Sequence, residues 1–120
     1  MAYNYTRARQ TSDMQIAKFG GGKGLGLLRR EGIADRKVTC AVIDYKPNEQ
    51  GLREVGARRA MVSALDPVTG GILAVPPDHN KDKLIFAGEV LRIVNPDRGP
   101  RPSGVPVYHD LEVLYDSRNV

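Results

Sequence analysis

The residues whose chemistry could build a metal or redox site are few in this 120-residue chain. His79 and His109 are its only histidines, and Cys40 is its only cysteine. The histidines stand in neither an H-x-H nor an H-x-x-x-H spacing, so the chain offers too few soft ligands for zinc. Cys40 lies within the apolar stretch "KVTCAVIDY", which predicts a small buried side chain rather than a reactive thiol. We therefore expect no metal site, no cofactor, and two histidines with solvated side chains.

The acidic residues and serines do not form a recognisable catalytic set. The acids at predicted strand ends and in loops, where they usually serve turn geometry, are Asp44, Glu54, Asp66 and Asp97. On paper, His109 and Asp110 could complete a triad with a serine. However, neither Ser63 nor Ser103 stands in the G-x-S-x-G context of an activated nucleophile. The sequence therefore favours a protein that is not an enzyme, and it indicates no catalytic residue.

The glycine-rich stretch "GGGKGLG" lacks the pattern of a phosphate-binding loop. Such a loop reads G-x-x-x-x-G-K-[ST]. Here Ala17 takes the place of the first glycine, and Gly24 takes that of the hydroxyl residue. We interpret the stretch as a flexible connection after a helix.

The basic residues give the chain a net charge of +4, and many of them gather in pairs. These pairs are Arg7 with Arg9, Arg29 with Arg30, and Arg58 with Arg59. Proteins that bind single-stranded nucleic acid place exposed aromatic side chains between such charges. Aromatic residues make up only 6% of this chain, and most lie near its start or at strand positions that look buried. Solvated faces or charges at a subunit interface are therefore favoured over contact with a DNA backbone.

The elements that must position these residues are one helix and a series of strands. The helix is predicted over 6–19, although Ser12 or Asp13 could equally cap a shorter helix from Met14. The glycines after Phe19 end it. The β-branched and alternating segments predict strands over 24–32, 36–45, 57–66, 72–75, 84–94 and 105–116.

Three of these strands carry specific expectations. The segment 36–45 is apolar on both faces, which predicts a central strand covered on two sides. Gly88 predicts a bulge or bend within 84–94. In 105–116, apolar and polar residues alternate, which is typical of a half-buried antiparallel strand.

Together these segments predict a mainly-β fold, a small antiparallel β-barrel or sandwich with one N-terminal α-helix and long loops. The length suits a single domain over 1–120, with 1–23 as an N-terminal arm and helix. Hydrophobic residues make up 41% and tryptophan is absent, so the core is thin and would gain stability from oligomerisation. Without a long apolar run or a secretory signal pattern, we expect no membrane span and a cytosolic origin.

A longer pattern covers nearly the whole chain. A helix ending in "AKFGGG" is followed by the basic strand "LGLLRR" and then by "VTCAVIDY". A late pattern of spaced residues comprises Pro77, Asp82, Leu84, Gly88, Val90, Ile93, Pro96, Tyr108, Leu111 and Val113. This order resembles that of the small head-completion proteins of tailed bacteriophages, also called stopper, head-closure or head–tail connector proteins.

The resemblance implies a structural virion protein located in the phage neck and made in the host cytoplasm. It implies a homo-oligomeric ring of six or twelve copies below the portal and adaptor proteins. Such a ring closes the DNA-filled head and provides the docking surface for tail terminator or tail tube proteins. It also implies non-specific contact with packaged DNA.

Under this resemblance, the segments 46–57 and 66–83 are candidate channel or partner loops. Candidate contacts to the channel DNA or to neighbouring copies in the ring are Arg53, Arg58 and Arg59. Candidate loop or partner contacts are Glu49, Gly51, Gly70, Gly71 and His79. If 46–51 is a tight hairpin turn, the loop after Asp66 takes the channel role.

Three alternatives remain. A neighbouring connector ring, such as the tail terminator, needs a similar β subunit with protruding loops. A basic OB-like module for nucleic acid would also fit a small barrel, but the scarcity of exposed aromatic residues argues against it. A small enzyme ranks third, because no set of catalytic residues supports it.

Overall fold

The computed structural model describes residues 4–45, 56–104 and 106–116. Its helix, α1 (Tyr5–Gly20), confirms the predicted one. The Asn4 side chain caps it by accepting a hydrogen bond from the Arg7 amide at 3.0 Å, so neither Ser12 nor Asp13 starts a shorter helix. The helix ends at Gly21, whose φ of 89° is the left-handed conformation that glycine adopts most readily.

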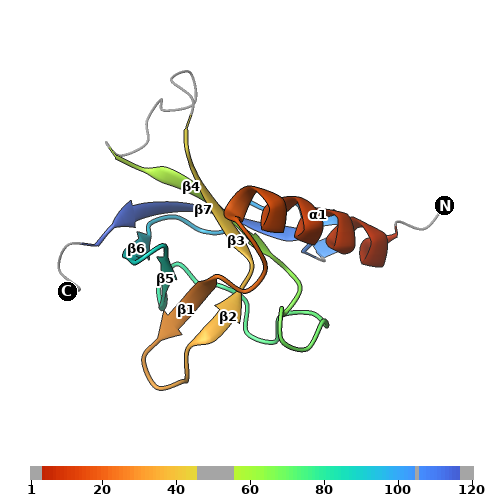
Figure 1. The fold of residues 1–120 in the computed structure, drawn as a ribbon, viewed down its shortest axis with the longest axis horizontal. Coiled ribbons are helices and arrows are strands. Elements are labelled where there is room, and N and C mark those ends of the chain that lie inside the picture. Colours follow the sequence, from red (N-terminus) through yellow and green to blue (C-terminus); the bar gives the residue numbers. More distant parts are fainter. Residues whose placement is uncertain (1–3, 46–55, 105, 117–120) are drawn as a thin grey trace.

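Seven strands form one antiparallel sheet that nearly closes into a barrel, which confirms the predicted fold class (Figure 1). They are β1 (Gly26–Arg30), β2 (Arg36–Val38), β3 (Cys40–Asp44), β4 (Arg58–Ser63), β5 (Asp82–Phe86), β6 (Glu89–Ile93) and β7 (Tyr108–Tyr115). Their order across the sheet is β2-β1-β5-β6-β7-β4-β3. The two strands at the ends of the sheet are therefore neighbours in the chain, and this is what brings the barrel close to closure.

The segment 36–45 is not the single central strand that the sequence predicts. It breaks at Thr39, so that β2 pairs with β1 while β3 pairs with β4 at the other end of the sheet. The Thr39 carbonyl accepts a hydrogen bond from the Ser63 amide at 2.8 Å. The segment is apolar on both faces because Cys40 belongs to the barrel core while α1 packs over the outer side of β3.

Two further strand predictions were wrong. Gly88 does not bend one long strand, because β5 and β6 are separate and form a hairpin with Phe86 opposite Glu89. Ala87 and Gly88 both have positive φ, at 52° and 79°, as two-residue hairpin turns require. The predicted strand 72–75 is reduced to an isolated bridge between Leu65 and Ile72.

The core fills the barrel interior, and α1 covers part of the outside. The buried apolar side chains that contact one another are Leu28, Val38, Cys40, Ala60, Val62, Leu73, Leu84, Leu91, Ile93, Leu111 and Val113. Outside, α1 packs on β3, β4 and β7. The strands β2, β1, β5 and β6 form the other part of the barrel wall (Figure 1). The barrel wall therefore has a helix side (β3, β4 and β7) and an open side (β2, β1, β5 and β6).

Candidate functional site

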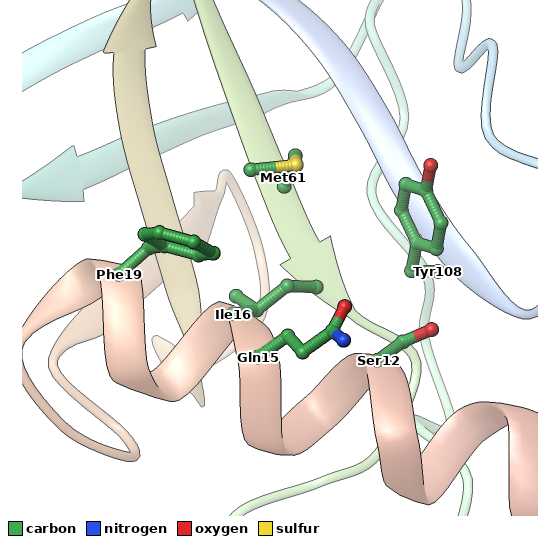
Figure 2. A pocket seen from close by; sticks show the side chains of 6 residues that line it. All are labelled: Ser12, Gln15, Ile16, Phe19, Met61 and Tyr108. Atoms are coloured by element: carbon green, nitrogen blue, oxygen red, sulfur yellow. The ribbon is translucent and has the colours of Figure 1, made fainter.

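An open apolar groove runs between α1 and the barrel wall on the helix side (Figure 2). It has a volume of about 110 Å³, and we call it the helix groove. Its lining consists of Ser12, Gln15, Ile16 and Phe19 from α1, with Met61 from β4 and Tyr108 from β7. The helix residues fall three or four positions apart, which places them along one side of α1.

The alternation of β4 explains why the groove has an apolar floor. Ala60 and Val62 point into the core, so Met61 between them points outward toward the helix. The Ile16 side chain is buried between α1 and the sheet, whereas the Phe19 side chain at the open end of the groove is 71% exposed. The exposed Phe19 and the half-buried Met61 and Tyr108 together form an apolar surface that another protein can cover.

A buried polar contact fixes the helix on the sheet and so fixes the groove. The Ser63 hydroxyl donates a hydrogen bond to the Asp13 carboxylate at 2.6 Å, and Lys23 pairs with the same carboxylate at 3.2 Å. Near the start of α1, the Tyr5 hydroxyl and the Arg9 side chain donate to the carbonyls of Pro102 and Pro106. The helix is thus held on the sheet near its start and at its middle, and this fixes the position of the groove.

A second hollow lies on the other side of α1, between the helix and the loop after β4. It has a volume of about 340 Å³ and is lined in part by Met14, Leu65 and Pro67. Met14, together with Val68 and Ile72 in that loop, is among the exposed large hydrophobic residues. Apolar side chains therefore reach the surface on both sides of the helix.

Of the predicted contact residues that the structure describes, only Gly70 lines one of these two hollows, the second one. Arg58 pairs with Asp44 and with Glu89, each at 3.3 Å, where β3 ends and β4 begins. Arg59 donates two hydrogen bonds to Asp110, each of 2.9 Å. These residues are held in ion pairs within the chain, and their role as channel or ring contacts stays a prediction.

The remaining predicted contacts are in loops. Gly70 and Gly71 lie in the exposed turn after β4, and His79 is half-buried before β5. Arg53, Glu49 and Gly51 lie outside the described residues. The structure brings none of the described contact residues into the lining of the helix groove, whose residues the sequence reasoning missed. The three-residue spacing of the apolar Ile16 and Phe19, which places both on one side of the helix, is the signal that could have indicated it.

His109 is not solvated as predicted, because it faces inward with Leu111 and Val113 and is only 1% exposed. Its Nδ1 lies 2.6 Å from the Asp97 carboxylate. Although burial alone would raise the pKa of Asp97, hydrogen bonds from His109 and from the amides of Gly99 and Asp110 lower it to about 2. This contact organises the loop between β6 and β7.

Two arginines of the predicted solvated pairs are also turned inward. Arg9 is buried against Pro106, and Arg30 donates two hydrogen bonds, of 2.9 and 2.8 Å, to Asp82. Arg36 adds a third at 2.7 Å, and the Asp82 side chain has no exposed surface. Burial alone would raise the pKa of Asp82, but the hydrogen bonds and the charges of the two arginines lower it.

The described residues give little support for metal or thiol chemistry. Within 4–45, 56–104 and 106–116, no group of three or more His, Cys, Asp or Glu residues could hold a metal ion. Cys40 is buried as predicted, and burial raises the pKa of its thiol to about 12. No helix in the described part of the chain is long and apolar enough to cross a membrane.

Comparisons of the chain with protein-family models, with curated proteins and with solved structures give no match.

Proposed function

We propose that this protein is a structural, non-catalytic subunit of the neck of a tailed bacteriophage. Copies would assemble as a ring below the portal and adaptor, close the DNA-filled head and present a docking surface to the tail. The proposal combines the resemblance in the sequence with one structural observation, the open helix groove with Phe19 at its mouth. The mainly-β barrel with an N-terminal helix is the fold that the resemblance implies.

The groove supports a contact between copies because it leaves large apolar side chains in water. Fully burying a phenylalanine is worth about 1.5–3 kcal/mol, and Phe19 is mostly exposed in the single chain. Met61 and Tyr108 beside it are only half-buried, so a neighbour that covers Phe19 would cover them as well. In a head-to-tail ring every copy offers its groove to the next copy, and no groove stays open.

The pairing of β3 with β4 supports the other half of the proposal, a channel-facing segment between these two strands. β3 and β4 lie side by side, with Asp44 opposite Arg58 at the ends that adjoin 46–55 (Figure 1). Arg58 begins β4 and pairs with Asp44 at the end of β3, next to the connecting segment. In the ring, these two strands would carry the channel-facing segment toward the axis.

The proposal is tested by assembly on a purified portal–adaptor complex, imaged by electron microscopy. The wild-type protein should add a ring below the adaptor. Phe19→Ser should strongly reduce ring formation, because it removes the apolar group at the mouth of the groove. Tyr115→Ser is the matched control, since Tyr115 is 63% exposed but lies at the far end of β7.

Three results would contradict the proposal: no added ring, equal loss in both variants, or no loss in Phe19→Ser. Binding to isolated tail tubes in place of the portal–adaptor complex would instead identify a tail terminator, the neighbouring ring.

A further inference from the structure

The open side of the barrel carries a row of cations across three strands. Leu28, Leu84 and Leu91 point into the core, so the residues next to them in β1, β5 and β6 point outward. Among these outward residues, Arg29 is directly opposite Lys83, and Lys83 is directly opposite Arg92. Directly opposed residues have Cβ atoms about 5 Å apart. The sheet therefore places three positive charges in one line perpendicular to its strands.

Such a row is unfavourable for the isolated chain, because like charges directly opposite each other destabilise a sheet. Two members are partly compensated, Arg29 by Asp35 and Lys83 by Asp116, each at 2.9 Å. Arg92 is exposed, and the described part of the chain gives it no ion-pair partner. The barrel thus keeps a charge repulsion that a polar residue at position 92 would avoid.

More cations surround the row. Lys37 in β2 faces outward opposite Leu27 and is exposed, and Lys81 is exposed just before β5. Among the described residues neither has an ion-pair partner. A hollow of about 490 Å³ lies beside the row, and its lining comprises Arg29, Arg30, Glu31, Ile33, Asp35, Lys81 and Lys83.

We propose that this open side binds the phosphate backbone of duplex DNA without reading its sequence. We call the surface the basic face and define it by Arg29, Lys37, Lys81, Lys83 and Arg92. A line of cations on a stiff sheet suits a backbone whose charges also form a line, and binding releases the counterions that DNA holds. The proposal rests on the neck function for its partner, packaged DNA, and deepens it by assigning this contact to a surface other than the predicted Arg53, Arg58 and Arg59. Its test does not depend on ring formation.

Duplex DNA is favoured over single strands because the outward positions of β1, β5 and β6 hold no aromatic side chain for base stacking. The competing partner is an acidic protein surface. The row of outward residues next to the cations is aliphatic, with Leu27, Ile85 and Val90 directly opposite one another. A protein partner would contact these aliphatic side chains as well as the cations. The experiment must therefore separate DNA from an acidic polypeptide.

The test is fluorescence anisotropy with a labelled duplex of about 30 base pairs, titrated between about 50 and 200 mM salt. If three unpaired cations each neutralise one phosphate, log Kd should rise with log salt with a slope of about 3. Lys37→Glu/Arg92→Glu should weaken binding at least about tenfold at the lower salt concentration. Arg7→Glu/Lys18→Glu, which makes the same change in net charge on exposed positions of α1, should weaken it only about twofold.

Equal losses in the two double variants would overturn the proposal, because net charge and not the basic face would then govern binding. Tighter binding of a single strand of equal length, or binding of polyglutamate without binding of the duplex, would overturn it as well. Phe19→Ser should bind the duplex like wild type. Failure of ring assembly and failure of DNA binding are therefore separate results.

Discussion

The helix side and the open side of the barrel share one interior but differ in what their outward residues carry. Both sides contribute aliphatic residues to the same core, at alternate positions. On the helix side the outward residues Met61 and Tyr108 form the floor of an apolar groove. On the open side the equivalent positions hold Arg29, Lys83 and Arg92. The comparison indicates that the inward positions specify the barrel, while the outward positions give it one apolar and one basic surface.

The two sides are also held together differently. On the helix side, the buried Asp13 carboxylate receives a neutral hydroxyl and one exposed lysine. On the open side, the buried Asp82 carboxylate joins Arg30 of β1 and Arg36 of β2 to the start of β5. The open side therefore depends on a buried ion cluster, which is strongly destabilised when one member is removed.

The largest expected effect is that of Asp82→Ala, which leaves Arg30 and Arg36 without their buried counter-charge. Breaking a buried ion pair from one side typically costs about 3–5 kcal/mol. We expect a loss of that size in the free energy of unfolding, measured by urea denaturation. Asp35→Ala is the control, because it removes the exposed partner of Arg29 and should leave the unfolding midpoint near that of wild type. Similar midpoints for the two variants would contradict the cluster's role.

Gly20→Ala tests how closely the helix side is packed. A Cβ atom at position 20 would overlap the Cys40 carbonyl oxygen in β3, a backbone atom that cannot move aside alone. Overpacking of this kind costs about 1–3 kcal/mol, seen as a lower thermal midpoint. Gly71→Ala should be nearly neutral, since an added Cβ there comes no closer than 3.7 Å to Thr69 Oγ1. If Gly20→Ala had the same thermal midpoint as the wild type, the helix would not pack against Cys40 as described.

Acid should weaken the protein through Asp97. The pKa of Asp97 in the folded protein is about 2, below the usual value near 4. The stability that Asp97 contributes to the folded state is therefore fully present above about pH 4 and is lost as the pH falls to about 2. We expect this loss to be about 1–2 kcal/mol. Asp97→Asn should reduce the difference in unfolding free energy between neutral and acid pH by that amount. An unchanged difference would show that Asp97 is not held by His109 and the two amides.

The smallest expected effect is a gain. Arg92→Glu replaces a like-charge pair with Lys83 by an opposite-charge pair, which is worth about 0.2–1 kcal/mol across a sheet. We expect a slightly higher thermal midpoint that approaches the wild-type value as salt is added. Arg98→Glu, in the loop after β6, should not show this gain. A lower midpoint for Arg92→Glu would mean that the row is not repulsive.

The sequence predicted features that depend on local pattern. The helix, the buried Cys40 and the alternation in the first half of β7 follow from spacing and composition within a few residues. In the second half of β7 the alternation fails, because Glu112 is buried and Tyr115 is exposed. The cluster at Asp82 could not be predicted in the same way, because Arg30 lies 52 residues away along the chain. The basic face depends on the register of β1, β5 and β6, which no single strand contains. Gly88 was misread because a bulge and a hairpin turn both favour glycine there.

The central claim is that the helix groove receives a neighbouring copy, and photo-crosslinking from its mouth tests this most directly. A thiol-reactive benzophenone label should attach only to the introduced cysteine of Phe19→Cys, because Cys40 is buried and its thiol pKa is about 12. On the portal–adaptor complex, we predict crosslinked products at multiples of the 13.2 kDa chain. The same label on Tyr115→Cys should give almost none. Only uncrosslinked chains from the Phe19 label, or equal products from both positions, would contradict the account.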